Sequence, residues 1–148
     1  MAGKKKIFNV IDLFAGVGGF SKGFEHAGFN IISAVEFNKS IANTYKKNHP
    51  NVKMFSEDII NIDIKKLSQN KKIDVIIGGP PCQGFSMSGR RIRGNGKFID
   101  DDRNQLFYQF YKIVKNLNPK VFVIENVQGI LNLENGKIKN EIFNLFND

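Results

Sequence analysis

Short apolar runs alternate with amphipathic stretches along nearly the whole chain. The runs have the length and β-branched content of buried strands, and they predict strands at residues 7–14, 30–35, 52–55, 74–78 and 121–124. Apolar positions three and four residues apart predict helices at residues 19–27, 39–47, 105–116 and 139–146. Strands that alternate with helices form a parallel sheet with right-handed crossovers. The predicted fold class is therefore α/β, a doubly wound, mostly parallel sheet that ends after about five strands.

Residues 85–102 do not follow this alternation. They contain several glycines, three arginines and three consecutive aspartates, but no sustained apolar period. A long connection of this kind inside a compact domain is usually functional or mobile, and the alternative is a solvated run of charge. No internal repeat or linker divides the sequence, so we expect residues 1–148 to belong to one domain.

The composition narrows the class of protein. A hydrophobic share of 41% in 148 residues supports one domain with a core and argues against disorder. The single cysteine excludes an internal disulfide and, with only two histidines, gives a poor ligand set for zinc, so we expect no metal. No apolar run approaches the roughly 20 residues of a membrane span, and no signal-peptide region is present. We therefore expect a soluble, cytoplasmic protein with no membrane association.

The formal charge of +8 favours an anionic partner, nucleic acid first. Two other causes remain open. Lys4, Lys5 and Lys6 form a terminal run that can act as a solubilising tail, and abundant Lys, Asn and Ile are typical of an AT-rich genome. Charge alone does not decide whether the chain binds nucleic acid.

Cys82 follows the strand predicted at residues 74–78, in the sequence Gly-Pro-Pro-Cys-Gln-Gly-Phe-Ser of residues 79–86. Each proline lacks an amide hydrogen and has a fixed φ, so the chain must leave the sheet there. The thiol is thus expected on a rigid turn at the carboxyl end of a strand, where open α/β sheets bind ligands. The alternative is a buried structural cysteine.

The first strand ends in a glycine-rich turn, Asp-Leu-Phe-Ala-Gly-Val-Gly-Gly, at residues 12–19. Such a turn lets the backbone approach a ligand, but Ser21 replaces the third glycine of a dinucleotide fingerprint. Glu36 ends the second strand, where a carboxylate can bind both ribose hydroxyls of a nucleoside. Asp58 follows the third strand and can accept a hydrogen bond from an adenine amino group, or else cap a helix. Together these features indicate an adenosine-containing cofactor.

Glu125, Asn126 and Val127 follow the fifth strand. If the sheet has the strand order 1-4-5, Cys82 and Glu125 stand on adjacent strand ends and face one cleft. We expect a buried Glu125 carboxyl to serve as a proton donor there, because desolvation favours its neutral form. The alternative is a glutamate that only caps a helix.

The blocks at residues 12–19, 79–86 and 125–127 resemble the signature blocks of the DNA (cytosine-5) methyltransferase family in sequence, order and spacing. The likeness covers nearly the whole chain, and the Pro-Pro-Cys-Gln block is its most specific part. Bacterial restriction–modification methylases look most similar. The resemblance implies the fold of S-adenosylmethionine-dependent methyltransferases, with methyl transfer to C5 of a cytosine flipped out of duplex DNA.

By this resemblance Cys82 attacks C6 of the cytosine, and Glu125 contacts N3 and the amino group. Glu36 holds the cofactor ribose, Phe37 flanks the adenine, and Asp58 with Ile59 reads the adenine edge. The rest of the cofactor wall is assigned to Phe14, Gly16, Gly18, Gly19, Pro81 and Leu106. The segment after Cys82 resembles a mobile loop that closes over DNA, with Ser86, Arg90, Arg91, Arg93 and Lys97 as candidate DNA contacts.

Members of this family are about twice as long or longer. The blocks that the resemblance leaves without a counterpart are a Gln-Arg-Arg block, a target-recognition domain and a late helix beside the first turn. We therefore expect residues 1–148 to be the N-terminal part of the catalytic domain, completed by a C-terminal part in the same chain or in a partner chain. The alternatives are a catalytically inactive cofactor- or DNA-binding fragment and a related transfer-RNA cytosine methyltransferase.

Overall fold

The computed structural model describes residues 6–81, 105–131 and 133–147. The strands are β1 (Asn9–Leu13), β2 (Asn30–Val35), β3 (Lys53–Phe55), β4 (Val75–Gly78) and β5 (Val121–Ile124). The α-helices are α1 (Gly19–His26), α2 (Lys39–Asn48), α3 (Ile64–Ser68), α4 (Gln105–Leu117) and α5 (Lys137–Asn147). Short 3-10 helices occur at η1 (Ile59–Asn61), η6 (Gln128–Leu131) and η7 (Leu133–Gly136).

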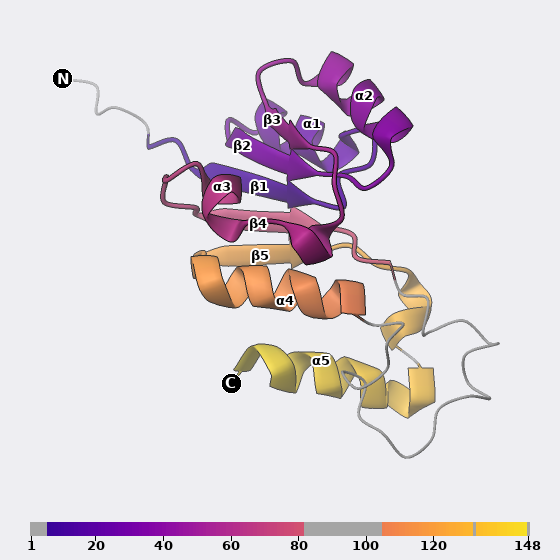
Figure 1. Ribbon diagram of the computed structural model, residues 1–148. Coiled ribbons are helices and arrows are strands. Elements are labelled where there is room, and N and C mark those ends of the chain that lie inside the picture. The colour runs from indigo at the N-terminus through magenta and orange to yellow at the C-terminus, as the bar shows by residue number, and fades with distance from the viewer. Residues whose placement is uncertain (1–5, 82–104, 132, 148) are drawn as a thin grey trace.

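All neighbouring strands run parallel, in the order β3-β2-β1-β4-β5 (Figure 1). The predicted α/β class and parallel sheet are confirmed. The chain moves outward from β1 to β3 and then crosses back to place β4 on the other side of β1. The strand order therefore reverses between β1 and β4, and such a reversal opens a crevice at the carboxyl ends of the strands.

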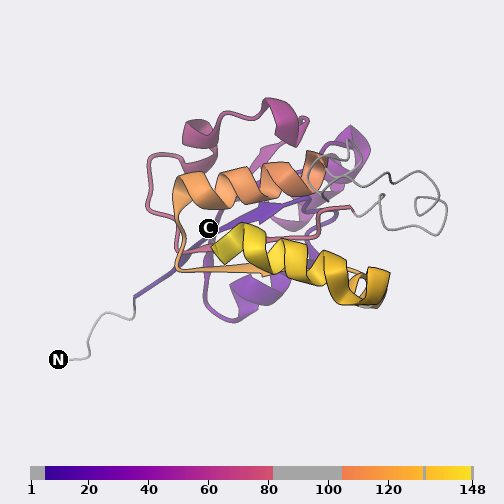
Figure 2. The same ribbon diagram turned by 90° about the horizontal axis from the view of Figure 1, so that it is seen from below.

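Alternate residues of β1 point into different core clusters, as the period of two in a strand requires. Ile11 and Leu13 pack with residues of α4 such as Phe110 and Ile113. Val10 packs on the other face, against side chains of α1. Figure 2 shows α4 lying along one side of the sheet with α5 next to it. Helices on both faces explain why β1 and β4 are apolar at every position except Asn9, Asp12 and Gly78.

Helix α5 is attached to the sheet through aromatic contacts. The Phe146 ring stacks on Phe122 of β5, with ring centroids 4.3 Å apart. It also meets Tyr111 of α4 edge to face, with centroids 5.4 Å apart. The predicted helix at residues 139–146 is thus present, two residues longer at its start and one at its end.

Two short elements between β3 and β4 were not predicted, η1 and α3. Each begins at an aspartate whose side chain accepts a hydrogen bond from a backbone amide two residues on, Asp58 from Ile60 at 3.0 Å and Asp63 from Lys65 at 2.9 Å. Such capping signals are visible in the sequence. Helices this short have too few apolar positions for a period to be recognised.

Strand β5 is the edge strand of the described sheet, and the side chains on one of its faces are partly exposed to solvent. Val121 and Val123 are 53% and 36% exposed. With Phe8 just before β1, Phe24 of α1 and Phe29 just before β2, they line an apolar groove of about 270 Å³. Across the described part of the chain, no helix is both long and apolar enough to cross a membrane.

Candidate functional site

A pocket of about 500 Å³ lies at the carboxyl ends of the strands. This volume is in the range of sites that hold a small-molecule ligand. The pocket collects residues from the ends of β1, β2, β3 and β4 and the start of α4. Its lining residues are Phe14, Val35, Glu36, Phe37, Glu57, Asp58, Ile59, Gly79, Pro81 and Leu106.

Two backbone amides hold the Glu36 carboxylate in place. The amide of Gly16 donates to its Oε2 at 3.0 Å, and the amide of Asn38 donates to its Oε1 at 2.9 Å. Each carboxylate oxygen has two acceptor sites, so each retains one for a ligand. A carboxylate fixed in this way suits two neighbouring hydroxyl donors, such as those of a ribose.

Aromatic and aliphatic side chains form the walls beside this carboxylate. Phe14 has φ +59°, a left-handed conformation that is costly for a bulky residue and is found most often at functional sites. Phe37 is 72% exposed and lines the same pocket. With Ile59, Pro81 and Leu106 nearby, the pocket has flat apolar surfaces for a base ring.

Asp58 has both of the roles that the sequence left open as alternatives. Its Oδ1 accepts a hydrogen bond from the Ile60 amide and caps η1. The residue also lines the pocket. Its contact with an adenine amino group remains a prediction.

Three pocket residues were not found from the sequence: Val35, Glu57 and Gly79. Glu57 matters most for the charge of the pocket. Together with Glu36 and Asp58 it gives the pocket lining three carboxylates. Such a pocket attracts a cation and repels a pyrophosphate. The only signal in the sequence was that Glu57 stands next to Asp58.

None of the three predicted glycines of the first turn is among the residues that line the pocket. Gly16 takes part through its amide to Glu36. Gly18 and Gly19 line a separate hollow with Val17, Lys22, Asn48 and His49. Gly18 has φ +96°, and a Cβ there would lie 2.3 Å from Nε2 of His49. The need for glycine at position 18 therefore comes from packing against α2.

The ends of β4 and β5 lie side by side, as the strand order 1-4-5 requires. The amide of Glu125 donates to the Gly78 carbonyl at 2.9 Å, and Asn126 Nδ2 donates to the Pro80 carbonyl at 3.2 Å. A Cβ on Gly79 would lie 2.9 Å from Glu125 Oε2, so the Glu125 side chain lies directly over Gly79. The expected burial of Glu125 is wrong, because β5 is the edge of the described sheet and the side chain is exposed.

Several predicted site residues lie outside the described residues. They are Cys82, Ser86, Arg90, Arg91, Arg93 and Lys97. Pro81, which immediately precedes Cys82, lines the pocket.

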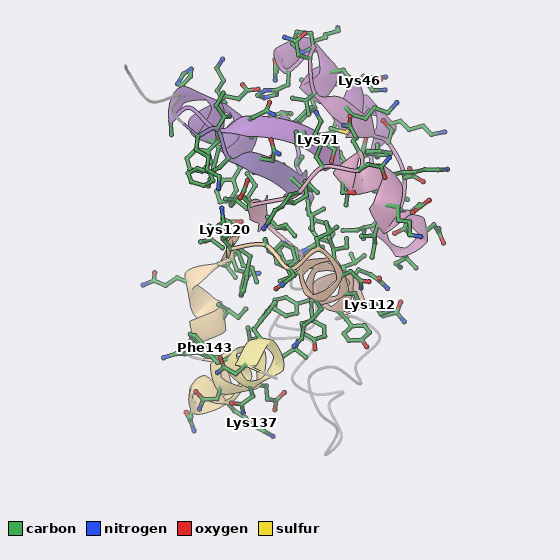
Figure 3. All side chains as sticks on the ribbon, turned by 90° about the vertical axis from the view of Figure 1, so that its left-hand side faces the viewer. Lys46, Lys71, Lys112, Lys120, Lys137 and Phe143 are labelled. Atoms are coloured by element: carbon green, nitrogen blue, oxygen red, sulfur yellow. The ribbon has the colours of Figure 1, made fainter. Side chains whose placement is uncertain are left out.

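The positive charge of the described part is spread over many elements. Figure 3 labels lysines from α2, α4, α5 and the loops before β4 and β5: Lys46, Lys71, Lys112, Lys120 and Lys137. Their separation means that the net charge does not by itself mark a nucleic-acid surface. Among the residues described, no cluster of His, Cys, Asp and Glu is placed to hold a metal ion.

The parallel sheet, the crevice at its switch point and the fixed carboxylate at the end of β2 define a nucleoside-cofactor-binding α/β protein. Within that class, residues 8–148 match the family model of the C-5 cytosine-specific DNA methylases. The chain belongs to this family, whose proteins use S-adenosylmethionine.

Named relatives agree with this membership. The chain is 50% identical over 127 residues to the Type II methyltransferase M.DdeI of Desulfomicrobium norvegicum, covering 85% of this chain and 29% of that protein. It is 43% identical over 139 residues to M1.HphI of Haemophilus parahaemolyticus, covering 92% of this chain and 37% of that protein.

A solved structure gives the same result at the level of the fold. Its protein is described as a DNA modification methyltransferase encoded within an E. coli prophage, and it superposes with a TM-score of 0.76 at 43% identity. The match covers 95% of this chain and 38% of that chain. The chain thus spans well under half the length of these relatives.

Proposed function

We propose that this chain is the cofactor-binding and catalytic part of an enzyme that transfers a methyl group from S-adenosylmethionine to C5 of cytosine in duplex DNA. In the proposal it acts together with a C-terminal part, in the same chain or in a partner, and works in the cytoplasm on the cell's DNA. The observation that carries the proposal is the position of the pocket. Its wall ends at Pro81, one residue before Cys82, and includes Gly79, over which Glu125 lies.

The pocket residues fit this cofactor. In the proposal the Glu36 carboxylate accepts from both ribose hydroxyls, and the Phe37 ring lies against the adenine. The three carboxylates favour a positively charged ligand. S-adenosylmethionine carries a sulfonium charge, and when bound it supplies an electrophilic methyl group.

We assign Cys82 and Glu125 to the cytosine. The Cys82 thiolate forms a bond to C6, while Glu125 supports proton gain at N3, and the displaced electron pair makes C5 nucleophilic. After C5 is methylated, loss of its proton restores the C5–C6 double bond and expels the thiolate. The covalent step is needed because an aromatic ring carbon is otherwise a weak nucleophile.

A covalent trap tests the proposal. The chain is completed with the C-terminal part encoded after it or beside it, and is given S-adenosylmethionine and duplex DNA that contains 5-fluorocytosine. Fluorine at C5 cannot leave as a proton does, so the enzyme remains bonded to the DNA. We expect Cys82→Ser to abolish this adduct, because an alcohol is a far poorer nucleophile than a thiolate. Glu125→Gln should slow adduct formation by about 100-fold or more, with DNA binding nearly intact.

The other outcomes separate the alternatives. Methylation of cytosine at C5 by a Cys82→Ala enzyme would refute the covalent mechanism, and methylation of the exocyclic amino group would refute the proposed reaction. An RNA stem carrying the same base tests the transfer-RNA alternative, which predicts trapping on RNA in place of DNA. Absence of methyl transfer with every C-terminal part would favour the inactive fragment.

A further inference from the structure

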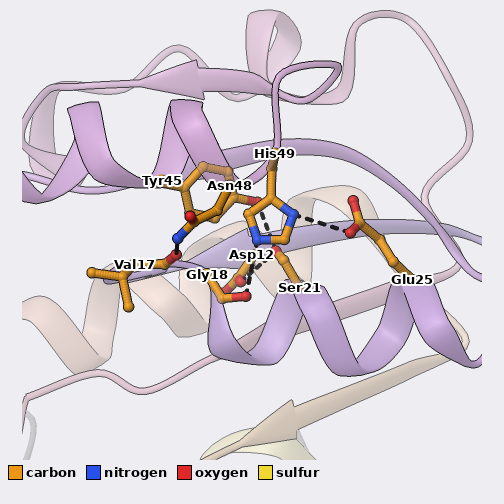
Figure 4. Close-up of polar contacts among 8 residues, drawn as sticks. All are labelled: Asp12, Val17, Gly18, Ser21, Glu25, Tyr45, Asn48 and His49. Carbon is orange, nitrogen blue, oxygen red and sulfur yellow. Dashed lines mark hydrogen bonds and ion pairs between the residues drawn. The ribbon is translucent and has the colours of Figure 1, made fainter.

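Two groups of buried polar side chains lie behind the glycine turn, between α1 and α2, and the rings of Tyr45 and His49 join them with centroids 4.6 Å apart (Figure 4). Asp12, Ser21, Tyr45 and His49 are each at most 2% exposed. Their contacts do not include the pocket that we assign to the cofactor. Burying a polar group destabilises the fold unless the group makes hydrogen bonds. The contacts of these four side chains therefore determine whether their burial destabilises the fold.

The first half of the set joins β1 to both helices. The Ser21 hydroxyl donates to Asp12 Oδ2 at 2.7 Å and lies 2.6 Å from the Tyr45 hydroxyl. Since Ser21 has one proton and gives it to Asp12, Tyr45 donates to Ser21. Burial raises the pKa of Tyr45, which keeps this donor protonated. The departure from the dinucleotide fingerprint at Ser21 thus has a structural reason.

The second half holds the turn itself. His49 Nε2 lies 3.1 Å from the Gly18 carbonyl, and Nδ1 lies 3.1 Å from Glu25 Oε2. Both neighbours are acceptors, so each contact is satisfied only by a ring nitrogen that carries a hydrogen. The preceding residue, Asn48, donates through Nδ2 to the Val17 carbonyl at 2.8 Å. Two consecutive side chains at the end of α2 therefore bind two consecutive carbonyls of the turn.

The opposite side of the same turn is bound to the end of β2. The amide of Ala15 donates to the Val35 carbonyl at 2.9 Å, and the amide of Gly16 donates to Glu36 Oε2 at 3.0 Å. Only the short segment Ala15 to Gly18 separates the two sets of contacts. A turn this short transmits a displacement of its Val17 and Gly18 carbonyls to the Gly16 amide.

We propose that Asn48 and His49 are positioning residues, which fix the turn from behind and so orient the Glu36 carboxylate toward the ribose. This inference rests on the proposed cofactor role of the pocket. The residues act through the Gly16 amide and touch no ligand themselves. Asn48 is the better test position because its side chain is exposed and its loss leaves a carbonyl that water can reach.

The experiment compares Asn48→Ala with Asn43→Ala, a matched change at an exposed position of the same helix. Amide hydrogen exchange of Gly16 is measured in both variants without ligand. We expect exchange at Gly16 to become about fivefold faster in Asn48→Ala and to stay unchanged in Asn43→Ala. A factor of about five corresponds to the free energy of one hydrogen bond. His49→Gln can keep only one of the two ring contacts, and exchange at Gly16 should become faster in this variant too.

Calorimetric or NMR titration of the chain completed with its C-terminal part, with S-adenosylmethionine as the ligand, supplies the second readout. The Asn48→Ala variant should bind about fivefold more weakly than wild type, and this loss should vanish when Glu36 is also replaced by alanine. An additive effect in the double variant, or faster exchange with unchanged affinity, would overturn the proposal. If the wild-type chain completed with its C-terminal part binds no S-adenosylmethionine at all, that result counts against the proposed function, and Gly16 exchange alone then decides whether the turn is held as described.

Discussion

Glu36 shows how one side chain depends on the backbone around it. Its carboxylate is fixed by the amides of Gly16 and Asn38, at distances of 3.0 and 2.9 Å. Asp58 is tied to only one amide, that of Ile60. In the proposed function the first residue accepts from two ligand hydroxyls and the second from one amino group.

We predict that Glu36→Ala reduces affinity for S-adenosylmethionine more than Asp58→Ala does. Loss of a carboxylate leaves about two unpaired donors in the first case and about one in the second, each hydrogen bond to a charged group being worth roughly 1.5–3 kcal/mol. Calorimetric titration of the two variants measures the difference. Equal losses would contradict the roles assigned here, and Ile60→Ala, at an exposed position on η1, controls for a general disturbance of that segment.

At the scale of elements, the turn between β1 and α1 is held by packing as well as by hydrogen bonds. Gly18 adopts φ +96°, and its Cα faces the ring of His49. The next element, α1, contains a second glycine, Gly23, whose Cβ position is open. Gly18 and Gly23 thus have opposite requirements.

We predict that Gly18→Ala lowers the free energy of unfolding by about 2–4 kcal/mol, because the new methyl group meets a buried ring and a left-handed backbone. Gly23→Ala should raise it by up to about 1 kcal/mol, because alanine is the better helix former. Denaturant unfolding of both variants checks the pair. A neutral Gly18→Ala would show that α2 can move away from the turn.

The sequence was sufficient for the main elements because each combines an apolar run with a stop signal. The strand at residues 30–35 and the fifth strand at 121–124 were predicted with the bounds that the structure has. Glu125 was placed beside the end of β4 on the condition of a strand order 1-4-5, and the structure has that order. Its exposure was not predicted, because burial at a sheet edge depends on what covers that edge. The contacts of Asn48 and His49 join residues 31 apart in sequence, and no local pattern reports such a pairing.

For the whole molecule, the buried carboxyl of Asp12 links folding to pH. Burial raises the pKa of Asp12 from 3.8 to about 6, with hydrogen bonds from Ser21 opposing the rise. Between these two values the folded state binds the proton and the unfolded state does not. The contribution of Asp12 to stability is therefore full below about pH 4 and is lost as the pH rises through about 6.

We predict that Asp12→Asn removes this dependence. The free energy of unfolding of the variant, relative to wild type, should increase by at most about 3 kcal/mol between pH 4 and pH 7. The prediction concerns this difference, because Lys120 lowers the pKa of Asp74 and gives wild type an opposite slope in acid. Denaturant titrations across the pH range measure it, with Asp63→Asn as control for the loss of one carboxylate. Parallel curves for Asp12→Asn and wild type would show that Asp12 does not titrate in this window.

The position of β1 in the sheet has a consequence for how the chain folds during synthesis. Of the described strands β1 is synthesised first, yet it lies at the centre, between β2 and β4. Its pairing with β2 spans about 20 residues and can form early, whereas its pairing with β4 joins Val10 to Val75. Until β4 and then α4 have emerged, Ile11 and Leu13 lack the side chains of α4 that cover them in the folded protein, and one edge of β1 is open. The nascent chain therefore passes through an interval with an unpaired apolar strand, when chaperone binding or misassociation competes with folding.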